Sequence, residues 1–188
     1  LEDLCTELFD KFNVETLPIA GDLSVRADID QLIAGTAHLP IGVAILNAGY
    51  GTSGKFLSSR LEDELNMLDL NSKALLVLTH HFARTLKKRR GRGAIVLMSS
   101  MVAFQGVPYA ANYAATKAYV QSLGEALSIE LKPEGIDLLC AAPGPVESGF
   151  SERANMRMGA TLTPKNVAVS ILRAIGRRST VLPGFLTK

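Results

Sequence analysis

The 188-residue sequence has little cysteine, little net charge and no long hydrophobic run. Its two cysteines, Cys5 and Cys140, have neither metal-site spacing nor the number that a disulfide framework needs, so we expect a reducing, cytoplasmic setting. A formal charge of +2 is too small to favour nucleic acid or a membrane surface as a partner. No apolar stretch approaches the roughly 20 residues of a membrane span, so we expect no membrane partner.

What is present is the composition of an ordinary globular domain, with 47% hydrophobic and 20% charged residues. The length suits one domain with a sizeable core, so we predict a single domain over residues 1–188. The chain opens at Leu1, inside a helical apolar pattern, and this predicts that residues precede it in the natural protein. The pattern consists of Leu1, Leu4, Leu8, Phe9 and Phe12.

Short, continuous apolar runs alternate with helical patterns along the chain. The runs predict strands that are covered on both faces, at residues 17–20, 42–46, 94–98, 137–142 and, more weakly, 180–182. The helical patterns cover residues 26–37, 61–86, 112–131 and 164–177. Thr163 and Pro164 together form a helix-start signal. The alternation predicts an α/β fold with a parallel sheet and right-handed crossovers.

The segment 112–131 is apolar on two sides. One stripe can pack on the sheet, and the second either extends that buried face or is covered by another subunit of a homodimer or homotetramer. The first stripe is Val120, Leu123, Leu127 and Leu131, and the second is Ala115, Ala118, Ala126 and Ile129.

Residues 87–92 carry five basic side chains at the predicted end of a helix. Such a cluster can bind nucleic-acid phosphates, which would make binding sensitive to salt. It can equally be a solvated group of cations at the negative end of the helix dipole, and we favour this second interpretation.

Tyr113 and Lys117 lie four residues apart and so share one helix face. Ser100 ends the predicted strand 94–98, thirteen residues before Tyr113, at the sheet edge where ligands bind in open α/β folds. A tyrosine with a pKa near 10 needs help to act as a base at neutral pH, and a nearby ammonium lowers that pKa. These three residues can therefore form a proton-transfer group. Ser99 and Tyr109 are rivals, but Ser99 lacks this spacing and Tyr109 has no lysine four residues on.

Ser100 and the run Tyr113-Ala-Ala-Thr-Lys117 resemble the Ser-Tyr-Lys centre of the short-chain dehydrogenase/reductase family. Further matches extend through the chain in the order of the family's motifs. They are Asp22-Leu23 near the adenine, Asn47-Ala48-Gly49 beside the cofactor, Asn71 of the catalytic tetrad, and Pro143, Gly144 and Val146 flanking the nicotinamide.

The resemblance implies a Rossmann-like, doubly wound parallel sheet with helices on both faces, and an oxidoreductase that uses NAD or NADP on an alcohol or carbonyl. It implies that Tyr113 is the acid/base, that Lys117 lowers its pKa and binds the ribose, and that Ser100 orients the substrate. Asn71 would hold a water. The pocket walls would be Met101–Tyr109 and the lid-like segment Glu147–Leu162, and no metal is implied.

The sequence departs from the family's pattern at one point. The glycine loop Thr-Gly-x-x-x-Gly-x-Gly does not occur in it, so we expect that a βαβ unit of at least about 30 residues is missing before Leu1. A second cut, after Lys188, is left open by the strand-like run just before it. The residues that select NAD or NADP would lie in that unit, so the choice stays open. A non-catalytic, dinucleotide-binding regulator of the same fold is the alternative function.

Overall fold

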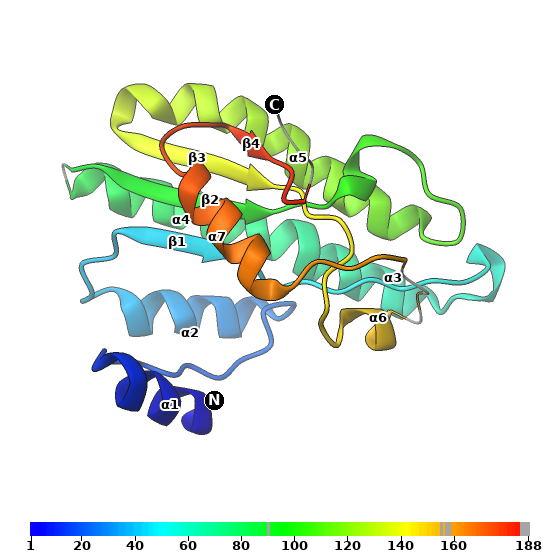
Figure 1. Cartoon of the computed structure of the whole chain (residues 1–188), viewed down its shortest axis with the longest axis horizontal. Coiled ribbons are helices and arrows are strands. Elements are labelled where there is room, and N and C mark those ends of the chain that lie inside the picture. Colours follow the sequence, from blue (N-terminus) through cyan, green and yellow to red (C-terminus); the bar gives the residue numbers. More distant parts are fainter. Residues whose placement is uncertain (90, 155, 157–158, 185–188) are drawn as a thin grey trace.

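The computed structural model describes residues 1–89, 91–154, 156 and 159–184, and it is an α/β fold (Figure 1). Its strands are β1 (Val43–Leu46), β2 (Gly93–Met98), β3 (Ile136–Ala141) and β4 (Thr180–Val181). They form one parallel sheet in the order β1-β2-β3-β4. The α-helices are α1 (Glu2–Phe12), α2 (Arg26–Thr36), α3 (Leu61–Leu68), α4 (Leu75–Lys88), α5 (Ala111–Leu131), α6 (Phe150–Arg153) and α7 (Pro164–Ala174).

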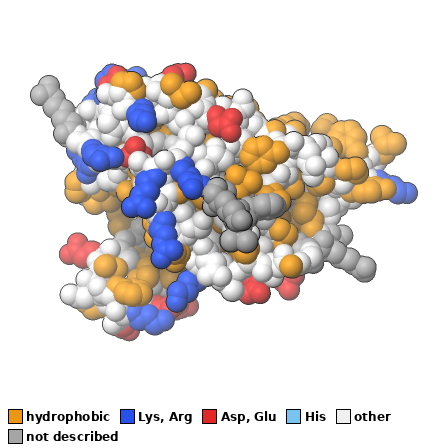
Figure 2. Space-filling model, turned by 45° about the horizontal axis from the view of Figure 1, so that its top comes forward, with side chains coloured by type: hydrophobic (Ala, Val, Ile, Leu, Met, Phe, Trp, Pro, Cys, Tyr) orange, Lys and Arg blue, Asp and Glu red, His pale blue; other side chains and the backbone are white. Residues whose placement is uncertain are grey.

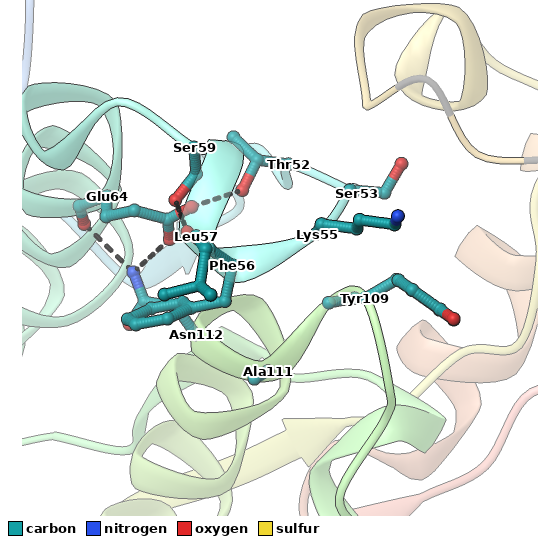
Figure 3. Close-up of a pocket in the computed structure, with 12 residues that line it drawn as sticks. Thr52, Ser53, Lys55, Phe56, Leu57, Ser59, Glu64, Tyr109, Ala111 and Asn112 are labelled. Carbon is teal, nitrogen blue, oxygen red and sulfur yellow. Dashed lines mark hydrogen bonds between the residues drawn. The ribbon is translucent and has the colours of Figure 1, made fainter.

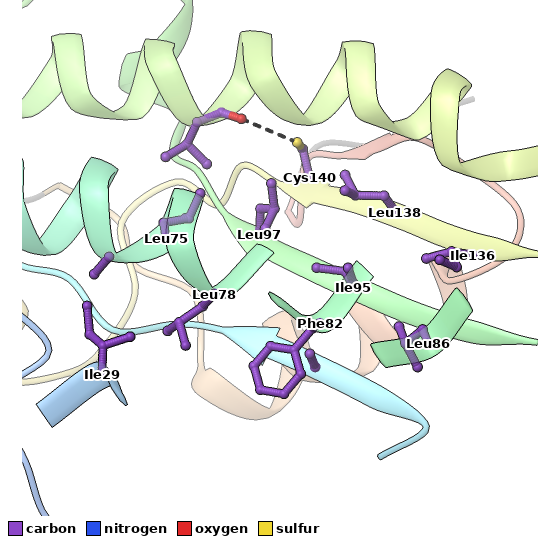
Figure 4. Close-up of a cluster of buried hydrophobic side chains, with 13 residues drawn as sticks. Ile29, Leu75, Leu78, Phe82, Leu86, Ile95, Leu97, Ile136, Leu138 and Cys140 are labelled. Carbon is purple, nitrogen blue, oxygen red and sulfur yellow. Dashed lines mark hydrogen bonds between the residues drawn. The ribbon is translucent and has the colours of Figure 1, made fainter. Parts of the chain in front are cut away.

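The sheet is covered on both faces because its central strands are apolar on both sides. In β2, Ile95 and Leu97 pack with α2, α4 and α5, whereas Val96 between them packs with α7. Figure 4 shows the larger of these two clusters, in which side chains of β2 and β3 meet Leu75, Leu78, Phe82 and Leu86 of α4. The predicted doubly wound architecture is confirmed.

The strand predicted at residues 17–20 does not form. Leu17, Pro18 and Ala20 are exposed, and the segment runs as irregular chain before α2. A strand needs a neighbour to accept and donate its backbone hydrogen bonds. Residues 17–20 pair with none of the described strands, although β1 lies at the edge of the sheet and pairs only with β2. Of the apolar side chains in this segment, Ile19 packs on a helix instead, with its Cδ1 atom against Gly35 of α2.

The long helix predicted over residues 61–86 forms, with an interruption that the pattern did not show. α3 passes into the π-helical segment Asp69–Ala74, which continues as α4. A π segment rotates the side chains that follow it relative to an unbroken α-helix, and such segments are frequent at functional sites. Asn71, one of the predicted site residues, lies inside it.

The two apolar stripes of α5 have different surroundings. Val120 is buried, and Leu123, Leu127 and Leu131 pack against the main core. Ile129 of the second stripe is 75% exposed, so the single broad buried face does not form within this chain.

The basic cluster lies at the end of α4, as the helix-capping interpretation requires. Lys87 pairs with Glu134 at 2.8 Å, and Arg92 pairs with Asp137 at 3.2 Å. Arg90 lies outside the described residues. Over the part of the chain that the structure describes, no helix is both long enough and apolar enough to cross a bilayer.

Candidate active site

The predicted catalytic side chains come from three elements that meet at the carboxyl ends of β1 and β2. Ser100 follows β2, Tyr113 and Lys117 lie in the first two turns of α5, and Asn71 lies in the π segment. Asn71, Tyr113 and Lys117 are all buried. The fold therefore brings together residues that are up to 46 positions apart in the sequence.

Lys117 is a buried cation. The residue is only 6% exposed, and its ammonium donates a hydrogen bond to the Met98 carbonyl at the end of β2, at 2.8 Å. Burial penalises the charged form of the side chain and lowers the pKa of Lys117 to about 8. The amine thus stays mainly protonated at neutral pH at a cost in stability, which points to a functional role.

Tyr113 does not have the lowered pKa that the sequence predicted. Burial raises the pKa of its phenol, and a hydrogen bond with Ser100 acts in the opposite direction. The ammonium of Lys117 lies 5.8 Å from the centroid of the Tyr113 ring. The four-residue spacing brings the Lys117 ammonium near the Tyr113 ring. The effect of desolvation on the pKa of Tyr113 is nevertheless larger, because burial disfavours the charged phenolate.

The Asn71 side chain forms hydrogen bonds with the backbone of the loop after β1. Its side-chain oxygen accepts a hydrogen bond from the Tyr50 N–H at 3.1 Å, and its amide nitrogen donates to the Tyr50 carbonyl at 2.8 Å. The same nitrogen donates to the Thr116 hydroxyl at 3.1 Å. Asn71 thereby links the loop after β1 to the helix that carries Tyr113 and Lys117.

The motif after β1 places Gly49 against this group. A Cβ atom at Gly49 would lie 2.9 Å from the Asn71 side-chain oxygen and 3.5 Å from the Lys117 nitrogen, so only glycine leaves this approach open. Asn47 and Ala48, which precede it, are exposed at the end of β1.

The segment after β3 runs along the same edge of the sheet. The Met101 N–H donates to the Pro143 carbonyl at 3.0 Å, and a Cβ atom at Gly144 would lie 3.0 Å from the Met101 sulfur. Val146 forms an isolated parallel bridge with Leu162. This segment thus lies directly beside the start of the chain that follows Ser100.

Asp22 and Leu23 lie before α2, where the chain turns. The Asp22 carboxylate accepts hydrogen bonds from the Ser24 N–H at 2.9 Å and the Ser24 hydroxyl at 2.7 Å, and these bonds lower the pKa of Asp22. Leu23 packs against the main core. The structure gives both residues a local structural role at the α2 end of the site.

The family model described as short chain dehydrogenase matches residues 1–159 of the chain. The chain belongs to the short-chain dehydrogenase family. The sequence resemblance is therefore confirmed. Among solved structures, the short-chain dehydrogenase from Sphingobium yanoikuyae in complex with NADPH superposes with a TM-score of 0.91 at 27% identity, covering 99% of this chain and 74% of that one.

Curated relatives are named as reductases of 3-oxoacyl and 3-keto compounds. A very-long-chain 3-oxoacyl-CoA reductase from Meyerozyma guilliermondii is 33% identical over 93% of this chain and 54% of its own length. A 3-ketodihydrosphingosine reductase from Bacteroides thetaiotaomicron is 30% identical over 90% of this chain and 62% of its own length. The chain spans about half the length of the first of these relatives.

The segment after Val146 packs against Tyr113. The Phe150 ring lies 5.4 Å from the Tyr113 ring between centroids, and Met156 packs in the same cluster. The Ser53 hydroxyl donates to the Ala154 carbonyl at 2.8 Å, which ties the segment to the loop after β1. Val102 and Val107 complete the apolar surroundings of Tyr113. Arg157 and Met158, which we expected in this wall, lie outside the described residues.

The residues of the site fit the nicotinamide-ribose part of a dinucleotide. A lysine ammonium has three donors, and among the described residues Met98 is the one acceptor that Lys117 contacts. The Lys117 nitrogen lies 3.5 Å from where a Cβ atom of residue 49 would be, so the glycine leaves room for its remaining donors on that side. Tyr113, Lys117 and the Asn47–Gly49 motif could therefore hold sugar hydroxyls at this edge of the sheet.

Two residues of the site escaped the sequence analysis. Thr116 is fully buried, and its hydroxyl donates to the Tyr113 carbonyl at 2.8 Å while it accepts from Asn71. Tyr50 supplies the backbone groups that Asn71 holds. Thr116 lies within the Tyr-Lys motif, and a threonine inside a helix often forms a hydrogen bond with a carbonyl of the preceding turn. Its bond to the Tyr113 carbonyl was therefore predictable from its position. The role of Tyr50 depends on a contact between distant residues and gave none.

Proposed function

We propose that the protein containing this chain is an NAD(P)-dependent oxidoreductase that interconverts an alcohol and a ketone or aldehyde. The observation that carries the proposal is the buried ammonium of Lys117 on the helix face of Tyr113, next to the open approach at Gly49. A buried charge whose pKa is strongly perturbed is costly to keep for packing alone. The NADPH-bound structural relative supports the choice of cofactor class.

In this function the bound nicotinamide supplies or accepts the hydride. The Tyr113 hydroxyl donates a proton to the carbonyl oxygen during reduction and takes it back from the alcohol during oxidation. Its raised pKa favours the protonated form that reduction requires. Ser100, which shares a hydrogen bond with Tyr113, holds the substrate oxygen at the phenol.

Lys117 and Asn71 position the cofactor and the walls of the site. The Lys117 ammonium binds the ribose hydroxyls and favours negative charge that develops on Tyr113. Asn71 fixes the loop that contains Gly49 and Tyr50 and the helix that contains Thr116, so the two walls of the site keep their spacing. Phe150 and its segment exclude water from the tyrosine.

We base the proposed substrate class on the names of the relatives. Relatives are named as very-long-chain 3-oxoacyl-CoA reductases, as a 3-oxoacyl-[acyl-carrier-protein] reductase and as a 3-ketodihydrosphingosine reductase. We expect a ketone of this type, because Val102, Val107, Phe150 and Met156 surround Tyr113 with apolar groups.

Replacing Tyr113→Phe in the full-length protein tests the proposed role. We expect turnover of a 3-oxoacyl thioester to be abolished while dinucleotide binding, measured by calorimetry, is retained. Tyr119→Phe is the matched control, since Tyr119 lies in the same helix with 40% exposure. Turnover that survives in Tyr113→Phe would remove the phenol from the mechanism. Dinucleotide binding with no turnover in the unchanged protein would instead favour the regulatory alternative.

We also propose a cytoplasmic homodimer or homotetramer. The exposed apolar side chains on α4 and α5 support self-association, and they include Leu76, Tyr119 and Ile129. Both cysteines are free thiols, which agrees with a reducing compartment. Analytical ultracentrifugation of the full-length protein tests the assembly, and Ile129→Glu should shift the distribution toward monomer.

A further inference from the structure

Tyr50, in the loop after β1, contacts several parts of the site at once. Its backbone N–H and carbonyl are both bonded to the Asn71 side chain. Its hydroxyl donates to the Asn66 side-chain oxygen at 2.9 Å and to the Asp63 carbonyl at 3.0 Å, both on α3. Burial and the Asp63 carboxylate raise the pKa of the Tyr50 phenol, so the ring stays uncharged at neutral pH. Its face is occupied by Arg153 of α6.

The contact between Arg153 and Tyr50 has the geometry of a cation–π interaction. The central carbon of the guanidinium lies 5.4 Å from the centroid of the ring, within the limit of about 6 Å for such contacts. Within the residues that the structure describes, Arg153 takes part in none of the ion pairs. The strands β1 to β3 point to the right in Figure 1, and in Figure 2 hydrophobic side chains predominate at that end. An aromatic ring, rather than a carboxylate, is therefore the partner of this cation.

The segment that contains Arg153 packs on the proposed acid/base, and residues 149–154 are called the covering segment below. Its Phe150 ring lies 5.4 Å from the Tyr113 ring between centroids. A Cβ atom at Gly51 would lie 2.9 Å from the Phe150 ring and 3.1 Å from the Tyr113 ring, so the two rings meet over a position that only glycine leaves open. The place of the covering segment thus determines how far Tyr113 is shielded from water.

The covering segment depends on contacts with other parts of the chain. Its helix α6 has only four residues, too few to be stable through its own backbone bonds. Apart from the Phe150 ring, its described attachments both lead to the loop after β1. The Ser53 hydroxyl donates to the Ala154 carbonyl at 2.8 Å, and in Figure 3 the Ser53 side chain points toward the ribbon of α6 at the upper right. The second attachment is the contact of Arg153 with Tyr50.

We propose that Tyr50 and Arg153 are positioning residues, whose contact holds the covering segment on Tyr113. The proposal rests on the proposed function for its effect on turnover. Asn71 fixes the backbone of Tyr50, so the ring presents a surface of fixed position to the guanidinium. Neither side chain is needed at the reacting atoms. Loss of the contact should therefore increase the fraction of molecules with the covering segment open and leave the chemical step unchanged.

Hydrogen exchange in the full-length protein measures this fraction. Arg153→Met removes the cation and Tyr50→Leu removes the ring. The probe is the protection factor of the Ala154 amide, which donates to the Phe150 carbonyl at 2.8 Å. Each variant should lower this factor about two- to fivefold, the size expected for a cation–π contact near the surface. Arg173→Met, which removes an exposed arginine of α7, is the matched control and should not change it.

A double variant and two conservative variants show whether the two side chains act through one contact. Arg153→Met combined with Tyr50→Leu should lower the protection factor no further than Tyr50→Leu alone, because the contact can be lost only once. Arg153→Lys keeps a cation and Tyr50→Phe keeps the ring, so both should retain most of the protection. A double variant that shows the product of the two single effects, or single variants that show no effect, overturns the proposal.

Turnover separates positioning from catalysis, with 3-oxobutanoyl-N-acetylcysteamine as the ketone. Arg153→Met should raise KM about two- to fivefold and leave kcat unchanged, because saturating substrate keeps the covering segment closed. A lower kcat with unchanged KM and unchanged protection would place Arg153 at the reacting atoms and overturn the proposal. If the unchanged protein turns over no ketone but the exchange results are as expected, the proposed reaction fails and the contact stands.

Discussion

Replacing Lys117→Met in the full-length, cofactor-free protein should make it more stable at neutral pH. Moving the pKa of a lysine from 10.5 to about 8 corresponds to a cost of about 3 kcal/mol for holding the charge in the folded state. Methionine fills a similar volume without that charge, but the Met98 carbonyl then loses its donor, which costs about 1–2 kcal/mol. The variant should therefore gain about 1–2 kcal/mol and lose activity, a trade expected at functional sites.

The gain should depend on pH in a defined direction. Below pH 8 the lysine is protonated in both the folded and the unfolded state, so the unchanged protein carries the full cost. Between pH 8 and 10.5 the folded state has lost the proton and the unfolded state still binds it, so the stability of the unchanged protein rises with pH. The difference between the two proteins should shrink through this window.

Urea denaturation of both proteins at several pH values between 7 and about 10.5 measures this difference directly. Lys73→Met is the control, because Lys73 is largely exposed in an ion pair with Asp69 and its loss should change stability little. A Lys117→Met variant that is less stable than the unchanged protein at neutral pH, or a difference that does not vary with pH, would refute the assignment of a costly buried charge.

Two further substitutions test the packing around the site. Asn71→Ala removes the side chain that pairs with both backbone groups of Tyr50, so urea denaturation should show a loss of about 3 kcal/mol. Asn66→Ala, which removes only exposed hydrogen bonds with the Tyr50 and Ser24 hydroxyls, should lose far less. Gly124→Ala places a Cβ atom in steric conflict with the Cys140 sulfur and should cost about 1–3 kcal/mol. Adding Cys140→Ala should restore much of that loss, and no restoration would contradict the clash.

The sequence predicted the order of the elements from its apolar runs; β2 and β3 are buried on both faces, whereas Val43 and Ile45 of β1 are about half exposed. Each of the strands β1 to β4 lies within one or two residues of its predicted bounds. The run at residues 17–20 has a similar composition and forms no strand. Composition shows that a segment can form a strand. Whether it does depends on whether the fold places it beside an unpaired strand, and no local pattern contains that information.

The sequence predicted that Ser100, Tyr113 and Lys117 lie close together, but it did not predict the pKa of Tyr113. The four-residue spacing placed Tyr113 and Lys117 on one face, and the strand end placed Ser100 beside them. Burial of the phenol, which raises the pKa of Tyr113, depends on Phe150 and other residues far along the chain. The π segment around Asn71 likewise depends on tertiary contacts, since its local sequence reads as ordinary helix.

The order of the strands in the sheet is also their order in the chain, and this has a consequence for biosynthesis. During synthesis from the N-terminus, the hydrogen-bonding partner of β2, β3 and β4 has in each case already left the ribosome. Within the described residues, each of these strands can therefore pair as soon as it emerges, without waiting for a later strand to be inserted. Ser100, Tyr113 and Lys117 all precede β3 in the chain, so these residues of the candidate site have been synthesised before the second of the three pairings can form.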